Sequence, residues 1–93
     1  MDVTVRDNAD ELRFELMLDG ELTGLAAYRV RDGITVITHS EIDVAHRGKG
    51  LGSDLARQSL DILRARDARI VPACPFFARY IADHPEYADL VEN

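Results

Sequence analysis

The spacing of apolar residues changes in the middle of the chain, and this change constrains the fold more than any other feature. Up to residue 44, apolar and polar residues largely alternate, which is the two-residue period of a β-strand. From residue 50 to residue 67, apolar residues recur every three or four positions, as on one face of an α-helix. Between them lies a glycine-rich segment, Arg-Gly-Lys-Gly-Leu-Gly at residues 47–52. The chain is therefore predicted to pass from a β-sheet to an amphipathic helix through a glycine-rich turn.

The first half of the chain is predicted to form an antiparallel meander of three or four strands. The strand-like runs cover residues 3–7, 12–18, 21–31 and 34–44. Asp-Gly pairs precede the third and fourth runs, and this dipeptide favours two-residue hairpin turns because both turn residues need a positive φ. In the second run, the residues predicted to share one buried face are Leu12, Phe14, Leu16 and Leu18.

The second half is predicted to be mainly helical. After the helix over residues 50–67, the expected elements are a strand over 68–73, a helix over 75–83 and a short helix or turn over 85–91. The helix over 75–83 begins with proline, which is favoured in a first helical turn. Strands followed by helices indicate an α/β fold of the mixed α+β kind. A length of 93 residues allows one domain, residues 1–93.

The composition excludes several classes of protein. A net charge of -6 argues against nonspecific binding of nucleic acid. No apolar run approaches the roughly 20 residues that span a membrane. The single cysteine, Cys74, excludes an internal disulfide and a Cys-rich zinc site, and no metal is expected. The N-terminus lacks the pattern of a signal peptide. The single cysteine predicts a cytoplasmic location.

Positive charge is concentrated around the glycine-rich segment. Residues 45–69 hold six basic and three acidic side chains, whereas the segments on either side are acidic. A basic stretch at a glycine-rich strand-to-helix turn suits a small anion such as phosphate, because the first turn of a helix carries unpaired N–H groups. The alternative is a solvated helix face with no ligand.

Two familiar phosphate loops do not fit the segment. The pattern Gly-x-Gly-x-x-Gly fails because Gly48 and Gly50 would require glycine where Ser53 stands. The Walker A pattern fails because no Gly-Lys-Ser/Thr occurs. What the segment does contain is Arg-x-x-Gly-x-Gly, with Arg47, Gly50 and Gly52 at the defined positions.

In this motif the chain resembles the GCN5-related N-acetyltransferases, whose acetyl-CoA pyrophosphate loop has the pattern Gln/Arg-x-x-Gly-x-Gly/Ala. Residues 71–87, Val-Pro-Ala-Cys-Pro-Phe-Phe-Ala-Arg-Tyr-Ile-Ala-Asp-His-Pro-Glu-Tyr, resemble the ending of a diminutive single-domain subfamily. The resemblance implies a strand over 68–73 that runs parallel to the last meander strand. It also implies that the N-terminal helices of larger relatives are missing, which leaves one sheet face open.

The resemblance implies acetyl-CoA as cosubstrate and transfer of its acetyl group to a primary amine. The acceptor, a small molecule or a protein partner, is not identified by the sequence. The residues expected to bind acetyl-CoA are Ile42, Asp43, Val44, Arg47, Gly48, Lys49, Gly50, Leu51, Gly52 and Ser53. The alternative functions are a non-catalytic acyl-CoA-binding or sensing module and an interaction domain with no such ligand.

Four residues are candidates for the chemistry of transfer. His39 and Glu41 lie on one face of a regular strand, and either is a candidate base for the ammonium proton, unless a bulge changes which of them faces the site. In the family, a tyrosine placed like Tyr80 often protonates the leaving thiolate. Cys74, at the start of the helix over 75–83, is either a covalent acetyl acceptor or a buried packing residue. His84 either pairs with this cysteine or caps the helix.

An open sheet face also predicts an association surface. The apolar residues expected to be exposed on it are Leu25, Ala27 and Ile37. Uncovered apolar surface often marks a site of contact with a partner. Weak dimerisation, or coverage by another protein, is therefore expected.

Overall fold

The computed structural model describes residues 2–92. Within this range the strands form one sheet in the order β1-β2-β3-β4-β5. Their bounds are β1 (Val3–Asn8), β2 (Arg13–Leu18), β3 (Glu21–Arg31), β4 (Ile34–Ile42) and β5 (Arg69–Pro72). The first four strands are antiparallel neighbours, and β5 pairs parallel to β4. The predicted meander and the added parallel strand are confirmed.

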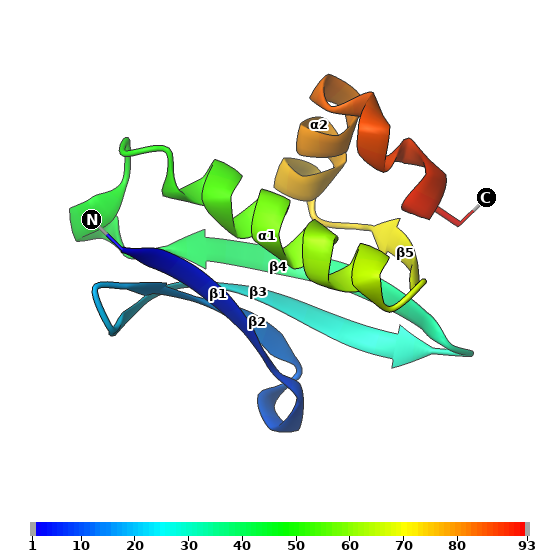
Figure 1. Ribbon diagram of the computed structural model, residues 1–93, viewed down its shortest axis with the longest axis horizontal. Coiled ribbons are helices and arrows are strands. Elements are labelled where there is room, and N and C mark those ends of the chain that lie inside the picture. Colours follow the sequence, from blue (N-terminus) through cyan, green and yellow to red (C-terminus); the bar gives the residue numbers. More distant parts are fainter. Residues whose placement is uncertain (1, 93) are drawn as a thin grey trace.

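Two α-helices, α1 (Leu51–Ala65) and α2 (Pro75–Asp83), lie on the same face of the sheet, as Figure 1 shows. Three short 3₁₀ helices complete the described chain: η1 (Ala9–Glu11), η2 (Val44–His46) and η3 (Pro85–Leu90). No α-helix of residues 2–92 covers the opposite face, which agrees with the expected open face. None of the helices in residues 2–92 has the length and apolar character needed to cross a membrane.

Both predicted Asp-Gly hairpin turns are present. Asp19 and Gly20 connect β2 to β3 with φ angles of 50° and 86°. Asp32 and Gly33 connect β3 to β4 with φ angles of 53° and 79°. A positive φ at both central residues gives a turn whose twist matches that of the flanking strands. The turns therefore set the registers of the meander.

The buried face of β2 is confirmed for Phe14, Leu16 and Leu18, which pack beneath the helices. The prediction is wrong for Leu12, whose side chain is 46% exposed. Leu12 precedes the strand and takes a left-handed φ of 54°, because its N–H closes the η1 turn on the carbonyl of Ala9 at 3.2 Å. The alternation of apolar residues therefore extends one residue beyond the strand itself.

Two predictions about β4 are also wrong. Ile37 was expected on the open face, but it is fully buried on the helix side of the sheet. Val44 was expected to end the strand, but β4 ends at Ile42. The carboxylate of Asp43 accepts a hydrogen bond from the amide of Ala45 at 3.4 Å and caps η2. Val44 is therefore drawn into that short helix, and its side chain is 71% exposed.

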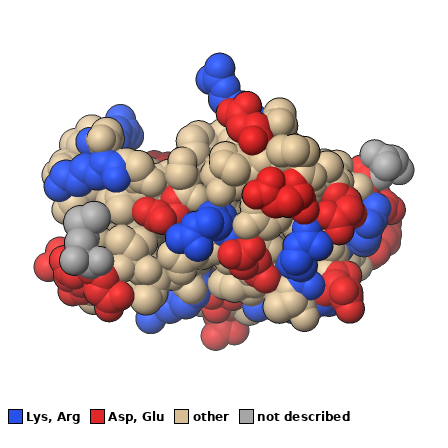
Figure 2. Space-filling view, turned by 45° about the horizontal axis from the view of Figure 1, so that its top comes forward, with Lys and Arg blue, Asp and Glu red and all other residues tan. Residues whose placement is uncertain are grey.

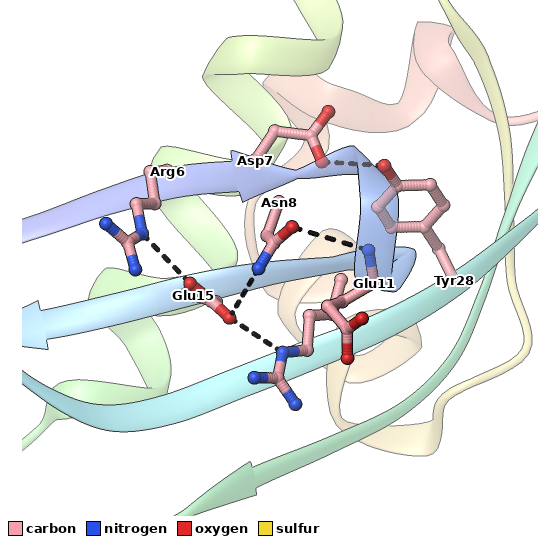
Figure 3. A network of polar contacts seen from close by, with 7 residues as sticks. Arg6, Asp7, Asn8, Glu11, Glu15 and Tyr28 are labelled. Carbon is pink, nitrogen blue, oxygen red and sulfur yellow. Dashed lines mark hydrogen bonds and ion pairs between the residues drawn. The ribbon is translucent and has the colours of Figure 1, made fainter.

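A buried carboxylate lies on the open face of the sheet. The side chain of Glu15 is directed away from the helices, yet the residue is only 1% exposed. Its oxygens accept hydrogen bonds from Arg6 at 2.9 Å, Arg13 at 2.7 Å and Asn8 at 3.1 Å. Figure 3 shows Arg6 and Asn8 reaching this carboxylate from β1. Polar side chains from two strands thus cover this part of the open face.

Glu15 should make the stability of the fold depend on pH. The Arg13 hydrogen bond, followed by those of Asn8 and Arg6, holds the pKa of Glu15 below its ordinary value of 4.5. Because the pKa is lower in the folded chain, this stabilisation is complete above the ordinary value and is lost as the pH falls through the folded value. Glu15→Gln should lower the free energy of unfolding at neutral pH by about 1–3 kcal/mol.

The measurement is urea denaturation of both proteins across the acidic range. The free-energy difference between wild type and Glu15→Gln should shrink as the pH falls below 4.5. If the free-energy difference between the two proteins stays constant until Glu15 is fully protonated, the network does not stabilise the ionised carboxylate. Arg6→Gln is a matched control, because it removes one cation from the network and leaves the carboxylate in place.

Candidate functional site

The glycine-rich loop has a backbone that only glycine adopts easily. Gly48 and Gly50 have φ angles of 83° and 78°, in the left-handed region. Gly50 is also the residue that caps the start of α1. Apart from the glycine itself and its two chain neighbours, no described residue has a heavy atom within 4 Å of the position that a Cβ would take at either glycine. The loop therefore presents bare backbone to an open space beside the helix.

The first turn of α1 adds hydrogen-bond donors to this loop. The first hydrogen bond of α1 runs from the amide of Asp54 to the carbonyl of Gly50, at 3.3 Å. The amides of residues 51–53 come before it in the helix and therefore have no carbonyl partner within the helix. Free amides and the positive end of the helix dipole suit a phosphate group. The backbone of residues 48–53 can thus act as an anion cradle.

The side chains of the loop strengthen its positive charge. Lys49 forms no ion pair with any residue in the range 2–92. Arg47 donates a hydrogen bond from Nε to the carbonyl of Ile42 at 3.1 Å, which ties the loop to the end of β4. Figure 2 shows basic side chains at the left end of the molecule, where Figure 1 places this loop. Lys49 is free for an anion, whereas Arg47 supports the loop.

The two parallel strands diverge next to the loop. Pairing of β4 with β5 ends where Ile37 faces Pro72. One further backbone bond, from the amide of Cys74 to the carbonyl of Ile37 at 2.8 Å, follows before the chain enters α2. From Thr38 to Ile42, β4 has no strand beside it on the β5 side among residues 2–92. This stretch of strand edge is open to a ligand.

A pocket of about 540 Å³ occupies the divergence. It joins the free part of β4 to the loop, the first turns of α1 and the start of α2. The residues that line it are His39, Ser40, Glu41, Ile42, Arg47, Gly52, Leu55 and Phe76. Six of these positions lie in β4, the loop or the first turn of α1, which are the segments that the sequence analysis selected. Ser40, Leu55 and Phe76 were not predicted as site residues.

A β-bulge in β4 decides which side chains face this pocket. Ala27 is opposite His39, whereas Tyr28 is opposite Ile37, so Thr38 is an extra residue in the ladder. Beyond the bulge, Ser40 has the helix-side orientation of Ile37, as its contact with Cys74 shows. His39 and Glu41 therefore stand on the open face, where His39 Nε2 lies 3.1 Å from Glu41 Oε2.

Cys74 is buried beside the pocket rather than part of its lining. The residue caps the start of α2 and is 3% exposed. Its sulfur lies 3.3 Å from the hydroxyl oxygen of Ser40. Ser40 does line the pocket, so its hydroxyl connects the thiol to the open space.

The structure does not bring Tyr80 into the pocket lining. Its buried ring stacks on the imidazole of His84, with the ring centroids 3.9 Å apart. Burial raises the pKa of the Tyr80 hydroxyl. His84 ends α2, and its Nδ1 lies 2.8 Å from the carbonyl of Tyr80. His84 thus has the capping position that the sequence analysis offered as one alternative.

Comparisons with known proteins agree with this arrangement of strand, loop and helix. Residues 13–90 match the family described as GCN5-related N-acetyl-transferase. The chain belongs to the GCN5-related N-acetyltransferase family. Its fold is similar to the solution structure of a GCN5-like protein from Staphylococcus aureus, with a TM-score of 0.70 and 18% sequence identity over 97% of this chain and 88% of that one. No curated protein matches the sequence.

The family assignment confirms the resemblance that the glycine motif indicated. Acetyl transfer is the activity that gives the GCN5-related N-acetyltransferases their name. The pocket and the anion cradle lie side by side in this member of the family, because Arg47 and Gly52 belong to both the loop motif and the pocket lining. The only sequence signal for Phe76 is that it is adjacent to Phe77, because two neighbouring residues of a helix cannot both face the core.

The loop geometry gives a prediction about stability. Gly50→Val should lower the free energy of unfolding by about 1–2 kcal/mol, because a left-handed backbone costs other residues that much. Gly50→Asn is the matched control and should cost less, since asparagine tolerates this conformation. Urea denaturation of the three proteins tests this. Equal losses for valine and asparagine would contradict a conformational requirement at Gly50.

Proposed function

We propose that the protein is an N-acetyltransferase that takes acetyl-CoA as its donor and a primary amine as its acceptor. The observation that supports the donor is the continuity of three features: the anion cradle at residues 48–53, the pocket next to it and the free edge of β4 beyond Thr38. A CoA thioester has matching parts in the same order, namely a pyrophosphate, a long arm with two amides and the thioester.

In this proposal the pyrophosphate lies against the amides of residues 48–53, with Lys49 as a nearby cation. The bare backbone at Gly48 and Gly50 allows oxygen atoms to come close. The arm then follows the open edge of β4, beginning near Ile42, whose side chain lines the pocket. Backbone amides and carbonyls of this edge can bond the two amides of the arm as a neighbouring strand would. The thioester then lies near Ser40 and the bulge.

The His39–Glu41 pair is proposed to remove the proton from the acceptor. Transfer requires that an ammonium group lose a proton, after which the neutral nitrogen attacks the thioester carbon, the C–S bond breaks and the CoA thiolate leaves. His39 lies on the open face and borders the pocket, and Glu41 is positioned to orient its imidazole. A neutral imidazole can take the ammonium proton, directly or through water. The nitrogen loses its second proton to solvent as the amide forms, and the thiolate takes up a proton from solvent or from an acid of the protein.

Tyr80 and Cys74 have less direct parts in this scheme. The buried Tyr80 hydroxyl keeps its proton at neutral pH, so its chemistry suits an acid, but its ring lies outside the pocket lining. The Cys74 thiol is covered, and it contacts the pocket only through Ser40. We therefore propose direct transfer from CoA to the amine, with Cys74 as a packing residue behind Ser40.

Binding of CoA is the first test. In a titration followed by NMR, the amide signals of residues 48–53 should shift with one saturation curve, because their N–H groups meet the pyrophosphate. The amides of the Asp32-Gly33 turn, which Figure 1 places at the opposite end of the molecule from the loop, are an internal control and should not move. Unchanged amides at residues 48–53 in saturating CoA would contradict the proposed donor.

Transfer is the second test. With acetyl-CoA and a panel of primary amines, His39→Ala should lower kcat/KM by about 10²–10⁴-fold, the usual contribution of a general base. Glu41→Gln should lower kcat/KM by less, because the glutamine amide can still form a hydrogen bond with the imidazole of His39. The pH dependence of kcat/KM is measured for each variant, and loss of the acidic limb of the wild-type profile shows that the general base has been removed. A Glu41→Gln variant that is more impaired than His39→Ala would reverse the two roles.

Binding without transfer would support the alternative function. The His39–Glu41 pair is exposed to solvent on an uncovered sheet face, which is an unusual setting for a catalytic base. If the wild-type protein binds CoA at residues 48–53 but acetylates no amine in the panel, a non-catalytic acyl-CoA-binding module becomes the better description.

A further inference from the structure

Phe76 has an unusual position for a large apolar side chain. It is 40% exposed, although its neighbour Phe77 is fully buried in the core. The two rings meet edge to face, with centroids 6.4 Å apart. Phe76 lies in the first turn of α2 and lines the pocket together with Leu55 and Ile42. Its ring therefore contributes apolar surface to the pocket rather than to the core.

The ring of Phe76 also lies directly against the backbone of α1. A Cβ at Gly52 would be 3.0 Å from Cζ of Phe76 and within 3.5 Å of two further ring carbons. A contact of 3.0 Å is tighter than nine in ten real Cβ contacts, so the ring would have to shift by a few tenths of an ångström. Gly52 has no left-handed backbone, unlike Gly48 and Gly50. The absence of a side chain at Gly52 thus has a steric cause within the protein.

We propose that Phe76 forms the apolar wall for the arm of the bound CoA thioester, and that glycine at position 52 leaves room for this ring to lie across the start of α1. This inference rests on the proposed function, since it assigns a binding residue to that same pocket. The arm contains a dimethyl-substituted carbon and several methylene groups. Moving these groups from water onto an aromatic surface lowers the free energy of the complex.

The position of Phe76 explains why this residue should contact the arm and not the phosphates. Gly52 lies in the first turn of α1, within the anion cradle and near its end, whereas Ser40 lies on β4 beside the thiol of Cys74. Both residues line the pocket with Phe76. The arm has to pass between these two points, and Leu55, Ile42 and Phe76 supply the apolar side chains along that path.

The test separates the arm from the nucleotide end of the ligand. CoA and adenosine 3′,5′-bisphosphate, which lacks the arm, are titrated into wild type, Phe76→Ala and Phe76→Leu. Phe76→Ala should weaken CoA binding about tenfold, as expected when much of an aromatic contact is lost. Binding of the bisphosphate should change less than about twofold, because only the arm meets the ring. Phe76→Leu should recover part of the loss.

A double-mutant cycle tests the reason for Gly52. Gly52→Val should weaken CoA binding strongly when Phe76 is present and only slightly in Phe76→Ala, because the valine then fills the space that the ring has left. Gly52→Ala should show the same pattern with a smaller loss. Equal losses in both backgrounds would show that the glycine serves the phosphates directly, and would overturn this part of the proposal.

The remaining outcomes are also distinguishable. An unchanged CoA affinity in Phe76→Ala, or equal losses for CoA and the bisphosphate, would overturn the assignment of Phe76 and leave the proposed function intact. A wild-type protein that does not bind CoA would overturn both. Since Phe76 is partly exposed, its variants should fold, and the amide spectrum of each variant confirms this before titration.

Discussion

The divergence of β4 and β5 is the constraint on which the site depends. The hydrogen bond from the amide of Cys74 to the carbonyl of Ile37 is the last backbone bond between the two segments. After it, α2 leads the chain away from the sheet while β4 continues to Ile42. The free strand edge, the pocket and the position of Phe76 all follow from that separation. A β5 that continued beside β4 would close the space in which a ligand can lie.

The bulge at Thr38 and the Glu15 network explain how the open face remains polar. The bulge places Ile37 in the core and His39 on the open face, although the two residues are two positions apart. On β2, Glu15 is surrounded by Arg6, Arg13 and Asn8, so this part of the sheet is covered by paired polar groups. The solvated face of an antiparallel sheet is commonly polar, because its residues alternate between core and water. Here, paired charges replace the covering helix over part of the sheet.

The parts of the fold that depend on local chemistry could be predicted from the sequence. The Asp-Gly turns, the helical period after the glycine-rich segment and the proline at the start of α2 each specify backbone conformation within a few residues. The parts that depend on distant partners could not. The bulge at Thr38 is defined by the pairing of β4 with β3, which lies outside the local sequence. Leu12 and Val44 are apolar and look like strand residues, but their backbones form turns and their side chains are exposed. The burial of Glu15 could not be predicted either, because its partner Arg6 lies on another strand.

The same limit applies to the candidate site. The motif of Arg47, Gly50 and Gly52 can be recognised in the sequence because its residues lie within one short segment. The motif does not show that its two glycines are needed for different reasons. In the structure they differ. Gly50 is needed for a backbone angle of 78° and has empty space around it, whereas Gly52 has an ordinary helical backbone and the ring of Phe76 against it. A single sequence motif therefore combines two physical requirements, and only the second connects the loop to α2 and to the wall of the pocket.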